Sequence, residues 1–171
     1  MTDIFEYLNK NGISYRRYDH EAVYTCEQAD CLDIPDGSAK TKNLFLRDRK
    51  GRRHFLVTVG ADKSVDIKAL ETLLGAKGLS FASSERLERH LGLHPGSVTL
   101  LGVINDRDCS VEVIIDRDLL KYDAMQCHPL VNTSTLVVST EDVMKFLELT
   151  GHLPLILDVP GQENVPPVDK M

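Results

Sequence analysis

The chain has 171 residues, a formal net charge of −6, 42% hydrophobic residues and 27% charged residues. This composition is that of an ordinary globular protein of one domain, and the acidic balance excludes binding of nucleic acid by neutralising phosphates over the whole surface. The N-terminus "MTDIFEYLNK" lacks the basic start and apolar stretch of a signal peptide. No run approaches the ~20 apolar residues of a membrane helix, so we expect a cytoplasmic protein without a membrane partner.

The pattern of apolar residues, caps and turns predicts short helices among a larger number of strands. In chain order we expect a helix (2–11), a strand (13–20), a helix from Thr25 that ends before Pro35, a hairpin (42–59), a helix (64–78), a strand (79–83), a helix (84–92), strands at 96–106, 111–120 and 133–139, and a helix (140–151). Strict alternation of strands and helices is absent, so a mixed α/β fold with a barrel-like mixed sheet and surrounding helices is favoured over a doubly wound parallel sheet.

The C-terminal end differs in composition from the rest of the chain. Residues 159–171 hold three prolines and few large apolar side chains, which is typical of a loose extension. We therefore expect one domain over residues 1–158, followed by a flexible tail.

Several common signatures of catalysis are missing. The sequence contains no Gly-rich dinucleotide fingerprint, no phosphate loop and no Gly-x-Ser-x-Gly elbow. Its histidines and cysteines do not stand at the spacings of metal ligands. We therefore expect neither a metal nor a cofactor.

The first positive signal is Lys42-Asn43, directly before the apolar run "LFL". Lys42 can supply a point charge for an oxygen anion, and Asn43 a directed donor and acceptor. The simpler alternative is a solvated lysine at the start of a strand, since lysine is mostly exposed.

The hairpin turn "RDRKGRR" has five basic residues in seven. It is either an exposed tip that charge keeps soluble or a patch that meets a phosphate backbone. The residue types do not separate these two interpretations.

Two further segments contain residues with special backbone or side-chain properties. Gly102 lies within the apolar run "LGVIND", where glycine in a strand marks a bulge or a close approach of a ligand. His128 precedes Pro129 in "HPLVNTST" and is therefore held extended. It is either a structural hydrogen-bonding residue or the wall of a pocket.

Taken together, "HEAVYTCEQAD", "AKTKNLFLRDRKGRRHFLV", "GSVTLLGVIND" and "HPLVNTSTLVVST" resemble the free-standing prolyl-tRNA editing proteins. That family is related to YbaK and to the insertion domain of bacterial prolyl-tRNA synthetases, and the chain most resembles its alanyl-tRNA(Pro) deacylase branch. The resemblance covers roughly residues 2–158. "GVIND" departs from the "GV-S/T-P" pattern of many relatives, so no role passes to Asn105 or Asp106.

The resemblance implies a mixed α/β barrel-like fold and hydrolysis of the ester that joins a wrong amino acid to the 3′ end of tRNA(Pro). The implied partner is the acceptor end of that tRNA, with prolyl-tRNA synthetase as a further partner and no DNA. The implied catalytic residues are Lys42, Asn43, Gly102 and His128, and the implied substrate contacts are Leu32, Val103 and Asn132. The expected tRNA-binding residues are Arg47, Arg49, Lys50, Arg52 and Arg53.

The implied chemistry agrees with the missing signatures. An aminoacyl ester is activated by the vicinal ribose hydroxyl and the α-ammonium, so no covalent nucleophile is required. Orientation of the ester and a water, together with stabilisation of the oxyanion, can supply the rate.

Three alternatives remain open from the sequence. The same fold can serve as a non-catalytic module that senses aminoacyl-tRNA or an amino acid. The substrate can be Cys-tRNA or another small aminoacyl-tRNA. A general hydrolase of small esters is a third alternative, against which stands the lack of a Ser-His or Cys-His signature.

Overall fold

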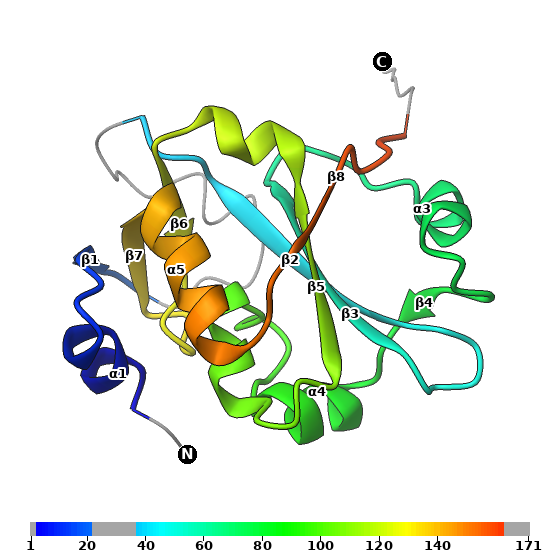
Figure 1. Cartoon of the computed structure of the whole chain (residues 1–171), viewed down its shortest axis with the longest axis horizontal. Coiled ribbons are helices and arrows are strands. Elements are labelled where there is room, and N and C mark those ends of the chain that lie inside the picture. The colour runs from blue at the N-terminus through cyan, green and yellow to red at the C-terminus, as the bar shows by residue number, and fades with distance from the viewer. Residues whose placement is uncertain (1–2, 22–36, 163–171) are drawn as a thin grey trace.

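The structure, a computed structural model, describes residues 3–21 and 37–162 (Figure 1). The helix predicted from Thr25 and the residue Leu32 lie outside these ranges. The described helices are α1 (Ile4–Lys10), α3 (Ile67–Leu74), α4 (Ser84–Leu91) and α5 (Thr140–Thr150), with 3₁₀ helices η1 (Leu100–Asn105) and η2 (Arg117–Lys121). The described strands are β1 (Tyr15–Asp19), β2 (Thr41–Arg47), β3 (His54–Gly60), β4 (Ser80–Phe81), β5 (Val111–Asp116), β6 (Ala124–Cys127), β7 (Ser134–Ser139) and β8 (Leu155–Leu157).

The strands form two sheets. One has the order β4-β2-β3-β5-β8, with antiparallel pairing of β2 to β3 and parallel pairing of β3 to β5 and of β5 to β8. The other is antiparallel, with the order β1-β7-β6. Within the described residues, Ala39 joins the sheets through a single parallel bridge to Met125. The mixed α/β class is confirmed, but these sheets remain open and do not close into a barrel.

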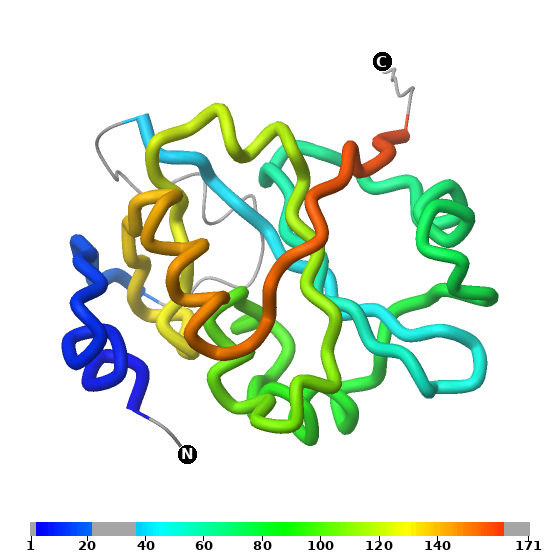
Figure 2. The backbone as a smooth tube through the Cα atoms, in the orientation of Figure 1, coloured from blue at the N-terminus to red at the C-terminus, as the bar shows by residue number. Residues whose placement is uncertain are grey.

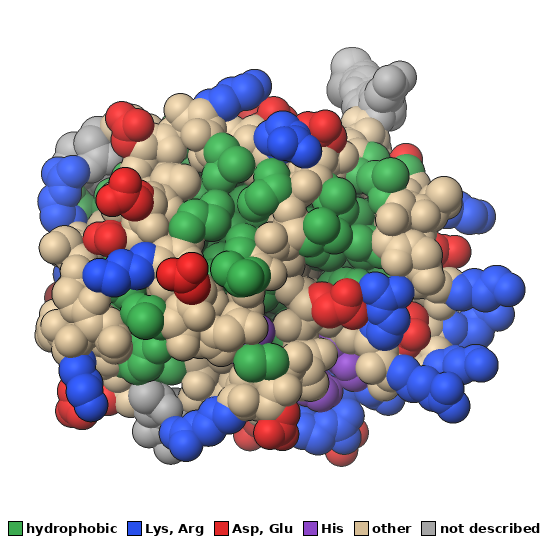
Figure 3. Space-filling model, viewed as in Figure 1, with side chains coloured by type: hydrophobic (Ala, Val, Ile, Leu, Met, Phe, Trp, Pro, Cys, Tyr) green, Lys and Arg blue, Asp and Glu red, His purple; other side chains and the backbone are tan. Residues whose placement is uncertain are grey.

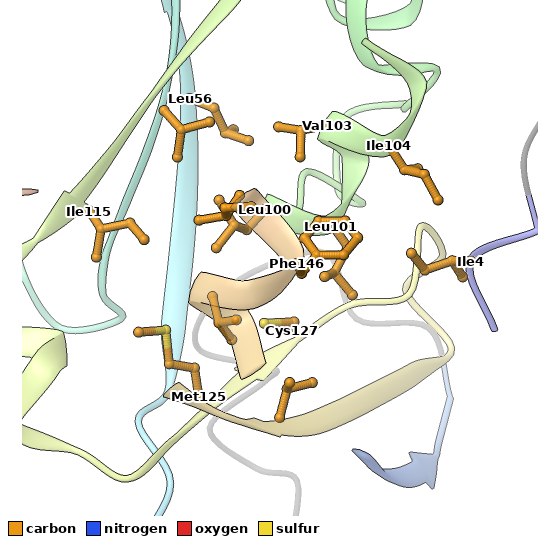
Figure 4. Packing of buried hydrophobic residues seen from close by; sticks show 14 of the residues in the cluster. Ile4, Leu56, Leu100, Leu101, Val103, Ile104, Ile115, Met125, Cys127 and Phe146 are labelled. Atoms are coloured by element: carbon orange, nitrogen blue, oxygen red, sulfur yellow. The ribbon is translucent and has the colours of Figure 1, made fainter. Parts of the chain in front are cut away.

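The larger sheet separates two apolar cores. Successive residues of a strand point to opposite faces, and every residue of β3 from His54 to Val59 is buried. On one face, Leu46 packs with residues of α3 and with Val159. On the other, Phe45 packs with η1 and α5, and Figure 4 shows Phe146 of α5 among these side chains. The β2–β3 hairpin therefore contributes to both cores.

The three later helices α3, α4 and α5 lie within the predicted ranges, and α3 is shorter at both ends than the predicted helix (64–78). The side chains of Asp66, Ser83 and Ser139 accept hydrogen bonds from backbone N–H groups in the first turns of α3, α4 and α5. These helices end at Gly75, Gly92 and Gly151, all with left-handed backbone conformations. The helix α1 is capped by Asp3, which accepts hydrogen bonds from the N–H groups of Phe5 and Glu6.

Parts of the strand prediction are wrong. The predicted strand at 96–106 is instead the 3₁₀ helix η1, and the second half of the predicted strand at 111–120 is η2. Residues 100–104 are buried without a break, and a short apolar run of this kind carries no periodicity that separates strand from helix. The short strands β6 and β8 were not predicted.

The chain continues as packed structure beyond residue 158, the predicted end of the domain. Val159 is buried, its N–H donates to Asp116 Oδ1, and its carbonyl accepts from Lys63 Nζ at 2.9 Å. Lys63 also pairs with the buried carboxylate of Asp116 at 2.5 Å. Figure 2 shows the chain after α5 running back along β5 towards the segment before α3, where Gly161 bridges Val65. Residues 159–162 are thus part of the folded domain.

Candidate active site at the open edge of β2

The site begins with a gap in the pairing of β2. One edge of β2 pairs with β3 along its whole length. On the other edge, Ala39 pairs with β6, and β4 pairs only from Leu46 onwards. Among the described residues, no strand therefore pairs with the edge between Thr41 and Leu44, and an edge of this kind presents main-chain hydrogen-bonding groups.

Lys42 and Asn43 flank this open edge from opposite faces of the sheet. Lys42 stands opposite Val59, on the face of Leu44 and Leu46, whereas Asn43 stands opposite Thr58. A group bound at the edge can meet both side chains, because the edge lies between the two faces. The two residues adjacent in the sequence thus lie on two sides of the strand.

The side chain of Asn43 has a fixed orientation. Its Oδ1 accepts a hydrogen bond of 2.6 Å from Oγ1 of the buried Thr58, and its Nδ2 donates to the carbonyl of Val98 at 3.5 Å. Since Thr58 supplies the hydrogen to Oδ1, the amide group is directed with Nδ2 towards the segment before η1.

The same segment holds His128. Thr99 Oγ1 donates to the His128 carbonyl at 2.7 Å, so Val98 and Thr99 connect Asn43 with His128. His128 Nδ1 lies 3.2 Å from the carbonyl of Ser134, which can only accept, so Nδ1 carries the hydrogen. Burial lowers the pKa of His128 from its usual value, so the ring is neutral near pH 7 with a lone pair on Nε2.

His20 is a polar residue of this region to which the sequence analysis gave no role. Its Nε2 lies 2.8 Å from Oγ1 of Thr135, and its Nδ1 lies 2.7 Å from the carbonyl of Glu21. The neighbouring Ser134 donates to Asp19 Oδ1 at 2.6 Å. His20 begins the motif "HEAVYT", which is the signal that could have identified it.

Gly102 lies in η1 and not in a strand, and its side towards the core is filled. A Cβ at Gly102 would stand 2.6 Å from Leu93 Cδ1 and 3.5 Å from Leu91 Cβ. Close packing of η1 against the end of α4 therefore explains why glycine stands at position 102. Val103, an expected substrate contact, is only 1% exposed and belongs to the core. Asn132 is half-buried in the loop after His128.

The basic hairpin residues divide into two groups. Arg53 makes a bidentate pair with Glu112, with both N–O distances at 2.9 Å, and Arg47 donates to the carbonyls of Asp48 and Arg49. In contrast, Arg49, Lys50 and Arg52 are exposed. Figure 3 shows Lys and Arg side chains gathered at the end of the molecule where Figure 1 places this hairpin.

Helix α4 places Arg86 beside the hairpin, a contact that the sequence did not reveal. Arg86 Nη1 donates to the carbonyl of Gly51 at 3.3 Å and lies 3.0 Å from His54 Nε2. Burial is the largest reason that the pKa of His54 falls to about 4. The positive charges of His90, Arg86 and Arg89 lower this pKa further. A local positive field thus exists at one end of an acidic protein.

The described residues offer little else for catalysis. Burial raises the pKa of the Cys127 thiol to about 12, so it is not a thiolate nucleophile near neutral pH. No group of three His, Cys, Asp or Glu side chains within the described ranges could hold a metal ion. Of the helices that the structure describes, none combines the length and apolar character needed to cross a bilayer.

The fold and the site together define a mixed α/β domain with hydrogen-bonded polar side chains beside a strand edge that no described strand pairs with. Residues 20–146 match the family model of the aminoacyl-tRNA editing domain. The chain therefore belongs to the aminoacyl-tRNA editing domain family, and its enzyme class is that of an aminoacyl-tRNA deacylase, a carboxylic ester hydrolase.

Similar proteins support this assignment. The prolyl-tRNA editing protein ProX of Acetoanaerobium sticklandii is 40% identical over 145 residues, which cover 85% of this chain and 88% of the relative. Prolyl-tRNA synthetase associated domain-containing protein 1 of Danio rerio is 34% identical, with 91% of this chain and 85% of the relative covered.

Solved structures share the fold at lower identity. The hypothetical protein APE2540 matches with a TM-score of 0.72 and 20% identity over 92% of this chain and 99% of its own. A structure described as a candidate trans-editing enzyme for prolyl-tRNA synthetase matches with a TM-score of 0.70 and 18% identity over 94% and 96%.

The packing around Gly102 can be tested by Gly102→Ala. The new methyl group overlaps Leu93, so we expect a loss of about 1–3 kcal/mol in the free energy of unfolding. Truncation in Leu93→Ala makes room for it, so the double variant should be more stable than the sum of the single changes predicts. Denaturant titration of all four proteins measures this coupling. A loss of deacylation without a loss of stability would instead indicate a direct role of Gly102 at the substrate.

Proposed function

We propose that the protein is a trans-editing hydrolase that deacylates mischarged tRNA(Pro), with Ala-tRNA(Pro) as its preferred substrate, in the cytoplasm. Prolyl-tRNA synthetase is the proposed source of that substrate. The observation that carries the proposal is the connection of Asn43 to His128 through Val98 and Thr99 beside the open edge of β2. The similarity to a prolyl-tRNA editing protein supports the choice of tRNA.

The proposed reaction is addition of water to the ester carbonyl. Lys42 and Asn43 flank the position of the ester and stabilise the negative charge that develops on the carbonyl oxygen. The neighbouring ribose hydroxyl of the substrate assists proton transfer to the leaving 3′ oxygen. The products are the free amino acid and tRNA with an intact 3′ end.

The neutral state of His128 suits this substrate. Burial lowers its pKa, so the ring does not repel the α-ammonium group of the aminoacyl ester. The hydrogen on Nδ1 is used by the Ser134 carbonyl, and the Nε2 lone pair is available to accept a hydrogen bond. Fixed in this way, the ring forms a rigid wall that favours a small amino acid.

The function is tested by comparing deacylation of Ala-tRNA(Pro), Cys-tRNA(Pro) and Pro-tRNA(Pro). We expect the fastest hydrolysis with the alanyl ester and little with the prolyl ester. Release of labelled amino acid above the spontaneous rate is the measurement. Tight binding without hydrolysis of any of the three would identify a sensing module, and a preference for the cysteinyl ester would reassign the substrate.

The size-selecting role of His128 is tested by His128→Ala. Because the ring blocks larger groups, its removal should lower the rate on Ala-tRNA(Pro) and raise relative activity on Pro-tRNA(Pro), by about tenfold or more in their ratio. The exposed His94→Ala serves as a matched control. If the ratio stays constant while the melting temperature and all activities fall together, His128 is a structural residue.

The exposed hairpin tip is proposed to contact tRNA phosphates. Charge reversal in Arg49→Glu/Lys50→Glu should weaken tRNA binding and reduce the slope of log K against log salt by roughly 0.7–0.9 for each lost contact. The control is Lys10→Glu/Lys145→Glu, with the same change in net charge on exposed residues of α1 and α5. Equal salt slopes in the two double variants would leave the hairpin charges with a role in solubility alone.

A further inference from the structure

A cavity lies at the start of β2, and its lining does not include His128. It has a volume of about 330 Å³ and is lined by Ser38, Ala39, Lys40, Gly60, Ala61, Asp62, Leu119 and Tyr122. This volume lies within the range of small-molecule sites in proteins. Ala39 and Lys40 begin the motif "AKTKNLFLRDRKGRRHFLV", but none of the proposed catalytic residues lines this cavity.

The lining combines an aromatic ring, two charges of opposite sign and an apolar floor. The side chains of Lys40 and Asp62 are exposed at the rim, and Tyr122 is 46% exposed. Ala39 and Leu119 are buried beneath them. A nucleotide matches this set, because its base can stack on the tyrosine ring, its phosphate can meet the ammonium and its ribose hydroxyls can donate to the carboxylate.

The cavity and the candidate active site lie along the same two chain segments. Ala39 pairs with Met125 in parallel orientation, so β2 and β6 run in the same direction away from the cavity. The first leads to Asn43 and the second to His128. Four residues of extended chain separate Ala39 from Asn43, which is about 13 Å.

Polar side chains connect these two segments between the sites. Gln126 Nε2 donates to Ser38 Oγ at 3.1 Å, and Thr41 Oγ1 donates to the Gln126 carbonyl at 2.6 Å. Met125 and Cys127 turn inward to the core, as Figure 4 shows, so Gln126 and His128 lie on the opposite side of β6. One single strand of nucleic acid is therefore able to reach from the cavity to the edge of β2.

We propose that this cavity binds a nucleotide of the unpaired 3′ end of tRNA, upstream of the terminal adenosine that carries the amino acid. The inference rests on the proposed function. It adds to that function the part of the tRNA that the cavity binds. Tyr122 stacks on the base, and Lys40 contacts the phosphate. Anchoring the strand there binds the tRNA end equally in the ground state and in the transition state, so it contributes to KM and not to kcat.

Tyr122→Ala tests the catalytic consequence. Loss of one stacked base should raise KM for Ala-tRNA(Pro) by about fivefold to a hundredfold, with kcat at saturation unchanged. Tyr122→Phe keeps the ring and should behave as wild type. Leu120→Ala is the matched control, since Leu120 is 39% exposed in the preceding 3₁₀ helix η2 and does not line the cavity. An unchanged KM in Tyr122→Ala, in a protein with a wild-type melting temperature, overturns the proposal.

A binding measurement separates this inference from the proposed function. A short single-stranded RNA that ends in CCA, without an amino acid, is titrated into the wild-type protein and Tyr122→Ala, with adenosine monophosphate as a second probe. We expect tighter binding of the RNA than of the monophosphate, and weaker RNA binding in Tyr122→Ala. Tyr122-dependent binding without any deacylation would retain the nucleotide site and reject the editing function. Deacylation by the wild type, together with RNA binding that does not depend on Tyr122, would retain the editing function and reject the nucleotide site.

Discussion

The antiparallel pairing of β2 with β3 is the constraint on which the rest of the structure depends. Its register sends Leu44 and Leu46 into one core and Phe45 into the other, so slippage by one residue would exchange the two faces. The same register places Lys42 and Asn43 on opposite sides of one strand. Because β6 and β4 pair only beyond the two ends of this stretch, no strand in residues 3–21 and 37–162 covers the edge between the two side chains.

Around that edge, hydrogen bonds fix the polar side chains of Asn43 and His128, and neither residue needs to act as a nucleophile. Thr58 orients Asn43 from within the sheet, and Thr99 and Ser134 hold His128 through main-chain carbonyls. Burial keeps His128 neutral, and burial also keeps the Cys127 thiol protonated. This arrangement suits a substrate that is already activated, since positioning and charge stabilisation are all that the protein must provide.

The distribution of charge resolves the contrast between an acidic protein and a polyanionic substrate. The net charge is −6, yet the β2–β3 hairpin concentrates positive side chains at one end. The depressed pKa of His54, which burial causes and neighbouring arginines strengthen, reflects that local field. Arg53 contributes little to binding in this scheme, because Glu112 already occupies its guanidinium group.

Local signals in the sequence were sufficient for elements whose ends are set by neighbouring residues. The helices α3, α4 and α5 and the turn around Gly51 were predicted because capping and turn formation depend on a few adjacent residues. Contacts between distant segments could not be predicted. The conformation of η1 depends on packing of Gly102 against Leu93.

For the candidate site, too, local signals identified residues, whereas contacts between distant segments could not be predicted. Lys42, Asn43 and His128 were identified from adjacent residues and from the family resemblance, but their relative placement was not. The opposite faces of Lys42 and Asn43 follow from register, and the link from Asn43 to His128 passes through Val98 and Thr99. Burial of Val103 and the pairing of Arg53 with Glu112 likewise depend on contacts between distant segments, so they could not be predicted from adjacent residues.

The central claim is that the open edge of β2 is the place of ester hydrolysis, with Lys42 and Asn43 acting from its two sides. The most direct measurement is the single-turnover rate of Ala-tRNA(Pro) deacylation by Lys42→Ala and Asn43→Ala, with the exposed Lys68→Ala as control. Removal of one group that stabilises an oxyanion costs about 2–4 kcal/mol, so both site variants should be slower by roughly a hundredfold or more, with the control unchanged. A near-wild-type rate in either folded site variant would contradict the claim.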